Sequence, residues 1–257
     1  MEFHTRQSVH MSMSLRDIET RLAVSPRPGI FSERDLEGLP EAARRMLSAA
    51  IDLGTPLAAA ARLRMRGSIK LNRWLPFRAR QVIAPGVGFV WRARVGGMIT
   101  GHDRCVYGEG AMQWKLASLL TVASGSGPDV SRSAAGREAG EALWVPTALL
   151  PSNGVEWLAT DVAHPIGRVR VAGGTIDVHY ELNTIGEVQS LQLPRWGDPD
   201  NTGSFSLHTF GGTMADHQSI GGVTIPTRGA VGWHFGEKEW PSGEFFRFHI
   251  TDFHLVH

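Results

Sequence analysis

A two-residue hydrophobic period that runs from residue 67 almost to the C-terminus is the feature that most constrains the fold. In GFVWRARV, residues 88–95, one side of a strand carries Phe89, Trp91, Ala93 and Val95, and the other side carries Arg92 and Arg94. Similar segments follow one another along the chain, with proline and glycine between them. This pattern predicts consecutive antiparallel strands in a sheet with one buried face and one face in water.

Two helical patterns precede these strands. Residues 40–54 place several alanines, Met46 and Leu47 on one face, between a proline that suits a first helical turn and a glycine that can end the helix. Residues 56–65, PLAAAARLRM, are a second short apolar segment with high helix propensity. Both segments predict helical structure before the sheet begins.

A third helical pattern interrupts the strands at residues 128–146. Asp129 or Ser131 can cap this helix, and Pro146 ends it. Alanines and glycines make one side of the helix very small, so we expect it to approach a sheet closely.

Period-two segments on both sides of this helix, without regular alternation of strands and helices, predict a mainly β fold. We expect a single large curved antiparallel sheet or partial β-barrel with two or three helices packed against it. Two prolines in SPRPG, residues 25–29, oppose helix continuation. The predicted organisation is a loosely ordered N-terminal arm over residues 1–30 and one domain over residues 31–257.

Charge and cysteine usage narrow the possible partners and location. Lys and Arg total 26 against 25 Asp and Glu, a balance that disfavours binding to nucleic acid. Cys105 is the only cysteine, so no internal disulfide can form, which suits a reducing compartment. The first residues carry charges throughout, and no segment approaches the ~20 apolar residues of a membrane span. We therefore expect a cytoplasmic protein with no membrane span.

Cofactor and metal motifs are missing from the sequence. It contains no phosphate-binding glycine loop ending in Lys and Ser or Thr, no GxSxG, no HExxH and no CxxC. Two groups of His and Asp, within residues 208–217 and 249–254, lack a diagnostic ligand spacing. We therefore expect neither a cofactor nor a metal ion.

A series of motifs resembles an uncharacterised bacterial family, a domain of unknown function. The motifs are LPEAARRML, PFRARQ, GFVWRA, GREAGEALWVPTALLP, RWGDP, VGWHFG and GEFFRF, and they span nearly everything from Leu39 onward. The resemblance implies no activity. By architecture the family is also similar to the curved-sheet lipoprotein carriers of bacterial envelopes, which hold acyl chains between a sheet and its helices, and this similarity is one of fold.

Eight tryptophans either fill the interior of a wide sheet or line an apolar pocket. Core filling is the simpler alternative, but a curved sheet with glycine-rich bends leaves room for a cavity. We expect a cavity with the helix near residues 135–143 as its lid or floor. The candidate substrate-binding residues are Phe89, Trp91, Tyr107, Met112, Trp114 and Trp144.

Three charged residues are candidates for catalysis. Arg137 and Glu141 lie at i and i+4 on the predicted helix, where side chains meet. The simplest interpretation is a structural ion pair; if the pair faces the cavity, desolvation could make Glu141 a general acid or base. Asp103 shares one face of its strand with Cys105 and Tyr107. Cys105 has no basic neighbour on that face to lower its pKa, so we expect it to serve packing only.

These residues support two functions. The first hypothesis is a cofactor-independent enzyme, of the isomerase or cyclase type, that positions a largely apolar small molecule and acts by general acid/base catalysis. The alternative is a noncatalytic carrier or sensor of lipids or other hydrophobic small molecules. Both predict a hydrophobic small-molecule ligand, and neither predicts an oligomeric state.

Overall fold

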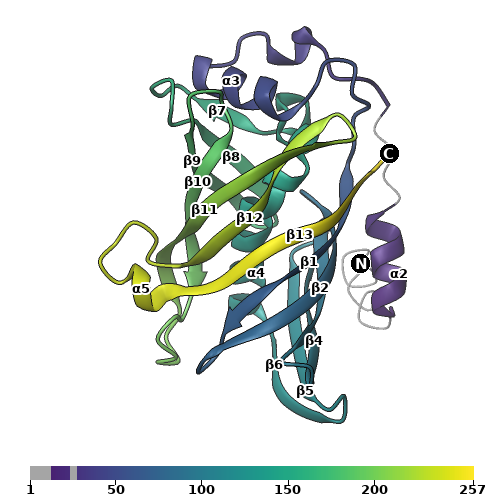
Figure 1. Ribbon diagram of the computed structural model, residues 1–257, viewed down its shortest axis with the longest axis vertical. Helices are drawn as coiled ribbons and strands as arrows, with labels where there is room; N and C mark the ends of the chain where they lie inside the picture. The colour runs from purple at the N-terminus through teal and green to yellow at the C-terminus, as the bar shows by residue number, and fades with distance from the viewer. Residues whose placement is uncertain (1–12, 24–27) are drawn as a thin grey trace, which may run out of the picture.

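One antiparallel sheet dominates the structure, a computed structural model that describes residues 13–23 and 28–257 (Figure 1). Within these residues, thirteen strands pair in the order β6-β5-β4-β3-β2-β1-β13-β12-β11-β10-β9-β8-β7. The strands are β1 (Ala60–Lys70), β2 (Trp74–Ala84), β3 (Gly88–Val95), β4 (Ile99–Val106), β5 (Glu109–Leu116), β6 (Leu120–Ser126), β7 (Glu156–Leu158), β8 (Ile166–Val171), β9 (Gly174–Leu182), β10 (Val188–Gly197), β11 (Ser206–Ile220), β12 (Val223–Trp233) and β13 (Glu244–Val256). The first and last strands pair at the centre, and β6 and β7 form the two edges. The prediction of a mainly β fold built on one curved antiparallel sheet is confirmed.

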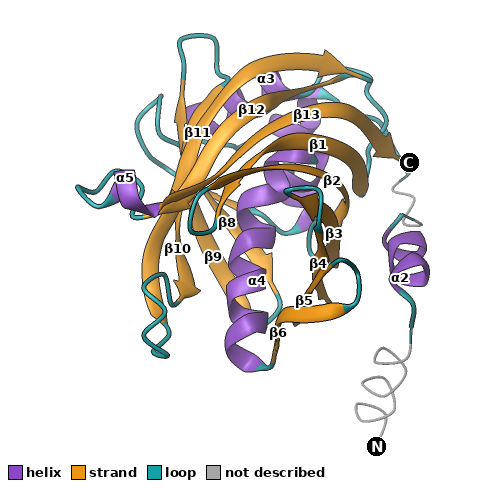
Figure 2. Cartoon of the chain, turned by 60° about the horizontal axis from the view of Figure 1, so that its bottom comes forward, coloured by secondary structure: helices purple, strands orange, loops and turns teal. Residues whose placement is uncertain are grey.

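Four helices accompany this sheet in the described residues. They are α2 (Leu15–Leu22), α3 (Glu41–Ala50), α4 (Pro128–Glu141) and α5 (Trp240–Gly243), with short 3-10 turns at Glu33–Leu36, Ala142–Trp144, Pro146–Leu149 and Pro151–Asn153. Helix α4 connects the edge strand β6 to the opposite edge β7, so the chain crosses from one edge to the other. Figure 2 shows the sheet curling around α4. Helix α4 therefore faces the concave side of the sheet, while α3 lies across one end of it.

Small residues let α4 approach the sheet closely, as the sequence predicts. A Cβ atom added at Gly140 would lie 3.1 Å from Cδ2 of Leu193 on β10. One added at Gly136 would lie 2.8 Å from Cγ of Arg195 on the same strand. Larger side chains at these positions would push the helix away from the sheet.

The predicted caps of α4 are wrong. Gly127 occupies the N-cap position without a side-chain hydrogen bond, and the helix begins at the following proline. Asp129 instead accepts a hydrogen bond from the indole N–H of Trp196 at 2.7 Å, and Ser131 Oγ accepts one from the backbone N–H of Gly110 at 2.9 Å. Both side chains thus hold the start of the helix against neighbouring strands.

Two other helix predictions also differ from the structure. Residues 60–65 of the alanine-rich segment belong to β1. Leu63 and Met65 alternate with arginines there, and hydrogen bonding to β2 and β13 on either side overrides the local helix propensity. The helix expected to reach Pro146 is α-helical only to Glu141 and continues in 3-10 turns.

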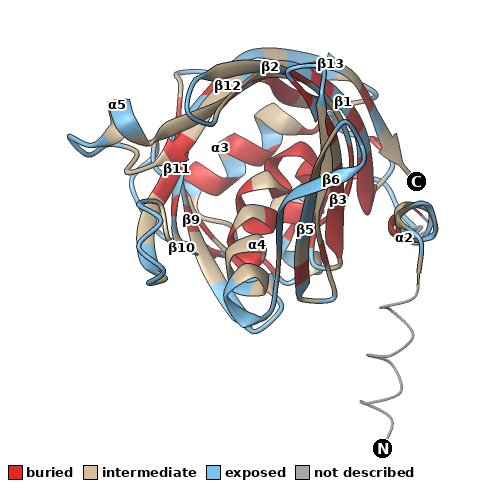
Figure 3. Ribbon diagram, turned by 90° about the horizontal axis from the view of Figure 1, so that it is seen from below, coloured by how far each residue is buried: buried red, intermediate tan, exposed pale blue. Residues whose placement is uncertain are grey.

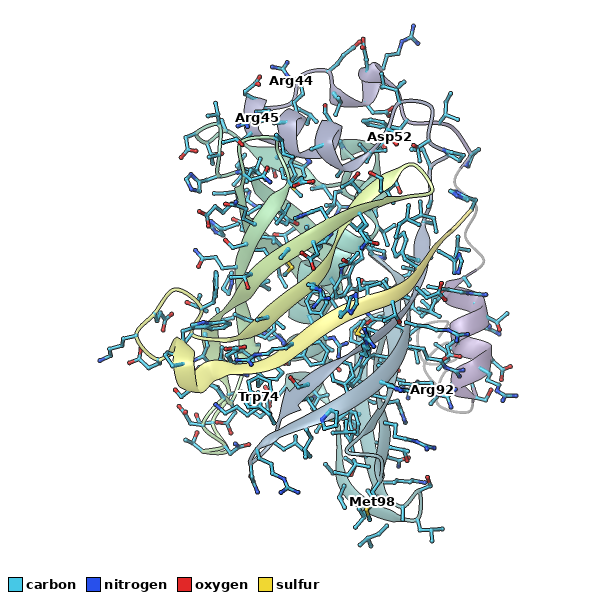
Figure 4. All side chains as sticks on the ribbon, viewed as in Figure 1. Arg44, Arg45, Asp52, Trp74, Arg92 and Met98 are labelled. Atoms are coloured by element: carbon cyan, nitrogen blue, oxygen red, sulfur yellow. The ribbon has the colours of Figure 1, made fainter. Side chains whose placement is uncertain are left out.

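The two faces of the sheet differ in the way that the period-two pattern predicts. Buried residues gather on the inner side (Figure 3), and arginines of β1, β2 and β3 lie on the outer side. Figure 4 shows Arg92 beside α2 on this outer side. Helix α2 buries Ile18 and Leu22 there, and its Glu19 lies 3.4 Å from Arg80 and 3.7 Å from Arg92.

The predicted N-terminal arm over residues 1–30 contains α2, and its residues 1–12 and 24–27 lie outside the described residues. The division into this arm and a single domain over residues 31–257 stays a prediction. Within the part of the chain that is described, no helix combines the length and the apolar character needed to cross a membrane.

Candidate ligand-binding cavity

A cavity of about 650 Å³ lies between the concave face of the sheet and α4. This volume falls within the roughly 300–1,000 Å³ of small-molecule sites in proteins. The lining is mostly apolar and includes the aromatic side chains of Trp91, Trp114, Trp144, Phe210, Phe245, Phe246 and Phe248. Several of these rings pack against one another at an angle, with centroids 5.7 Å apart for Trp91 and Trp114 and 5.4 Å apart for Trp144 and Phe248. Such packing favours a stable aromatic wall.

One polar cluster interrupts this apolar lining. Arg137 donates from Nε to Oε1 of Glu141 at 2.7 Å and from Nη1 to Oδ2 of Asp103 at 3.0 Å. The second oxygen of each carboxylate is also occupied: Trp114 Nε1 donates to Asp103 Oδ1 at 3.1 Å, and Gln81 Nε2 donates to Glu141 Oε2 at 2.5 Å. The cluster therefore joins α4 to β2, β4 and β5. The structure brings the three predicted catalytic residues together in one hydrogen-bonded group.

The charge of Arg137 is stabilised from two sides. Burial alone would lower its pKa, but Glu141 and Asp103 outweigh burial and raise the pKa above its ordinary value. The guanidinium carbon also lies 4.6 Å from the ring centroid of Phe89 and 5.1 Å from that of Trp91. These contacts support the interpretation of Arg137 and Glu141 as a structural ion pair. A role for Glu141 or Asp103 in proton transfer stays a prediction.

Four of the six predicted substrate-binding residues line the cavity, and two lie outside its lining. Those that line the cavity are Trp91, Met112, Trp114 and Trp144. Phe89 is only 1% exposed and lies behind the guanidinium of Arg137, outside the lining. Tyr107 is 60% exposed in the turn between β4 and β5, where its φ is 50°. The pattern that aligns Tyr107 with Asp103 assumes that the strand continues, but β4 ends at Val106.

A buried carboxyl that the sequence pattern does not single out lies on another side of α4. Glu138 is 4% exposed, and its Oε1 accepts a hydrogen bond from the Gly86 N–H at 2.8 Å. Burial raises the pKa of Glu138 to about 7. The pKa of Cys105 is raised to about 12, mainly by burial and to a smaller extent by the nearby charge of Glu138. Cys105 is therefore a poor nucleophile, in agreement with its expected packing role. The feature of the sequence that could have pointed to Glu138 is its position between Ala135 and Ala139, on the buried side of the helix.

Arg195 is a second cation in the cavity lining, although the sequence, where it stands beside Trp196, predicts only a residue that anchors a loop through hydrogen bonds. It follows Leu191 and Leu193 at alternate positions of β10, and both leucines are buried. An arginine on the otherwise apolar face of a strand is the signal that points to it.

The His and Asp residues considered from the sequence have separate partners, and His217 is half-buried, with its Nδ1 3.7 Å from Oε2 of Glu187. His254 Nε2 lies 3.0 Å from Asp252 Oδ1, and Asp216 pairs with Arg228 at 2.6 Å. Among the described residues, no group of three or more His, Cys, Asp or Glu side chains is arranged to hold a metal ion.

The fold and cavity define a class of proteins in which an open, curled antiparallel sheet encloses an apolar space against one helix. The chain belongs to the family of unknown function DUF6544, whose profile matches residues 29–245. The predicted resemblance to a family of unknown function is thereby confirmed. Among curated proteins, none matches the sequence significantly.

Two solved structures are similar in fold. One is described as an outer membrane lipoprotein-sorting protein domain from Vibrio parahaemolyticus, with a TM-score of 0.43 and 10% identity over 77% of this chain and 85% of that chain. The other is a LolA superfamily protein from Nitrosomonas europaea, with a TM-score of 0.41 and 10% identity over 89% of this chain and 95% of that chain. Similarity at this level does not establish a shared function.

Proposed function

We propose that this protein is a noncatalytic carrier or sensor of lipids or other hydrophobic small molecules, which it holds between α4 and the sheet. The cavity of about 650 Å³ and its aromatic lining carry the proposal. An apolar ligand that enters this space removes both its own surface and the aromatic surface from water, which is favourable. Both oxygens of Asp103 and of Glu141 accept hydrogen bonds within the protein, so a ligand can lie beside these carboxylates without breaking the bonds.

Filling the cavity tests this proposal. Val231 of β12 lines the cavity, whereas Ala230 is the adjacent residue on the same strand and points to the opposite face. We expect the purified full chain, stripped of bound lipid, to bind the neutral fluorescent hydrophobe N-phenyl-1-naphthylamine. Val231→Trp should weaken that binding about tenfold or more, since each buried CH2 contributes roughly 0.8 kcal/mol, and Ala230→Trp should not.

Circular dichroism checks that both variants fold, and Met112→Trp, which fills the cavity from β5, replaces Val231→Trp if the latter does not. The proposal is wrong if the wild type does not bind the hydrophobe, or if folded cavity-filling variants bind it as tightly as the wild type does.

A cofactor-independent enzyme is the second candidate, because Asp103, Arg137 and Glu141 all reach the cavity lining. The carrier is favoured over it, since every oxygen of the two carboxylates already accepts a hydrogen bond within the protein.

A further inference from the structure

The two cavity arginines differ in their charge partners. Arg137 contacts two carboxylates, at 2.7 Å and 3.0 Å. Arg195 donates from Nε to the carbonyl oxygen of Ser133 at 3.0 Å and from Nη2 to Ser133 Oγ at 3.4 Å, and both acceptors are neutral. In the described part of the chain, no carboxylate oxygen lies within 4.0 Å of the Arg195 guanidinium. Arg195 is thus a cation in the cavity wall without a directly bonded counter-ion.

The surroundings of Arg195 hold its side chain in one place. Its guanidinium carbon lies 4.4 Å from the ring centroid of Phe210 and 5.1 Å from that of Trp233. On the opposite side, the missing side chain of Gly136 leaves room for the aliphatic stem of the arginine. A guanidinium carries five N–H donors, and the bonds to Ser133 use only two of them. The remaining donors have no hydrogen-bond partner in the described part of the chain, and Arg195 lines the cavity.

Burial, and next the neighbouring charge of Arg137, lower the pKa of Arg195 to about 10. The guanidinium therefore stays protonated at neutral pH although the site disfavours its charge. A buried cation is costly unless an anion pairs with it, so an anionic group in the cavity would relieve this cost. The charges of Glu141 and Asp103 also reach Arg195, and they would repel a ligand that carries two negative charges more strongly than a ligand that carries one.

We propose that Arg195 binds the head group of a singly charged anionic amphiphile, a long-chain carboxylate, whose apolar tail lies along the aromatic lining of the cavity. This inference rests on the proposed function, because it names the chemical class of the ligand that the cavity carries. Planar carboxylates suit the forked donors of a guanidinium.

A series of twelve-carbon ligands that differ only in the head group tests the inference. Dodecanoate, dodecanol, dodecylammonium and dodecyl phosphate are titrated into the delipidated full chain, and their dissociation constants are obtained from displacement of N-phenyl-1-naphthylamine. We expect the wild type to bind dodecanoate about tenfold or more tightly than dodecanol and dodecylammonium, and more tightly than dodecyl phosphate.

Variants of Arg195 identify the group responsible. Arg195→Gln should remove the preference for dodecanoate and leave the affinity for dodecanol unchanged within about twofold, while Arg195→Lys should keep part of the preference. Arg132→Gln is the matched control, because Arg132 is exposed and its guanidinium carbon lies 3.8 Å from the Trp196 ring centroid, outside the cavity lining. This control should retain the full preference.

The outcomes separate this inference from the carrier function. If no ligand of the series and no neutral hydrophobe binds, the carrier function itself is wrong. If dodecanol or dodecylammonium binds as tightly as dodecanoate does, or if dodecyl phosphate binds more tightly, the carboxylate inference is overturned and the carrier function stands. The carboxylate inference is also overturned, and the carrier function stands, if Arg195→Gln weakens the binding of all ligands equally. Should Arg195→Gln not fold, the ligand series with the wild type still decides the sign of the head group, and Arg195→Lys tests the residue.

Discussion

Replacing Glu138 with glutamine tests whether water is excluded from the side of α4 where the Glu138 carboxyl is buried. The Glu138 carboxyl is 4% exposed and accepts a hydrogen bond from the Gly86 N–H at 2.8 Å. Burial is the main cause that raises its pKa from an ordinary 4.5 to about 7. Glutamine keeps an oxygen that can accept the hydrogen bond from Gly86 but cannot ionise. The pH-dependent part of the stability difference between the two proteins therefore comes from the titration of Glu138, whereas the altered contact with Cys105 contributes at every pH.

The sign of the effect follows from proton binding. The folded protein binds the Glu138 proton more tightly than the unfolded chain does, so the contribution to stability is fully present below about pH 4.5. This contribution is lost as the pH rises to about 7, where the folded protein must also ionise the buried carboxyl. A rise in pKa from 4.5 to about 7 corresponds to roughly 3 kcal/mol in the free energy of unfolding. Between pH 4.5 and pH 8, the free energy of unfolding of the wild type should therefore fall by up to this amount relative to that of the glutamine variant.

Urea unfolding of both proteins at several pH values between 4.5 and 8 measures this difference. Glu109→Gln provides the control, since Glu109 is an exposed glutamate on β5, and the stability difference caused by this substitution should vary by no more than about 0.5 kcal/mol over the same range. A constant difference between wild type and Glu138→Gln across these pH values would show that the carboxyl is solvated, and would refute the placement of Glu138 in a dry site.

Two further substitutions test the cavity cluster and the approach of α4. Glu141→Gln should destabilise the protein by about 1–3 kcal/mol, because it removes a charged acceptor from Arg137, and should leave the affinity for N-phenyl-1-naphthylamine unchanged within about twofold. For any reaction found, a loss of turnover of ~100-fold in a folded variant of unchanged stability would instead assign Glu141 to general acid/base catalysis. Gly110→Ala should destabilise by about 1–3 kcal/mol in thermal or urea unfolding, because a Cβ atom there would lie 2.7 Å from the Cα of Ser131 on α4. Gly125→Ala, whose nearest contacts would be 3.4 Å, should be nearly neutral, and equal effects of the two substitutions would contradict the close approach.

The strands could be predicted because alternation of side chains is a local property. Phe89 and Trp91 face inward and Arg92 faces the outer side because successive residues of any strand point in opposite directions. Alternation fails where it assumes that a strand continues beyond its end, as at Tyr107. Helix propensity fails at Ala60 and Ala61, because pairing within the sheet overrides it.

The candidate site was predictable only in part. Spacing on one helix places Arg137 and Glu141 together, because residues four apart meet on a helix surface. Their contacts with Asp103 and Gln81 depend on how α4 lies across the sheet, and no local pattern contains that information. The burial of Glu138 and the neutral hydrogen-bond partners of Arg195 likewise depend on residues that are distant in the chain.

The amino-acid sequence by itself determines the mainly β character of this protein, the two faces of its sheet and the small side of the helix at residues 128–141, because these follow from side-chain periodicity and size over a few residues. Only the tertiary structure decides that β1 pairs with β13, that α4 crosses the inner face between the two edges, and that a cavity stays open between them. The physical reason is that these features depend on pairing and packing between segments far apart in the chain, such as Ala60 and Val256, so their energies are not contained in any single segment.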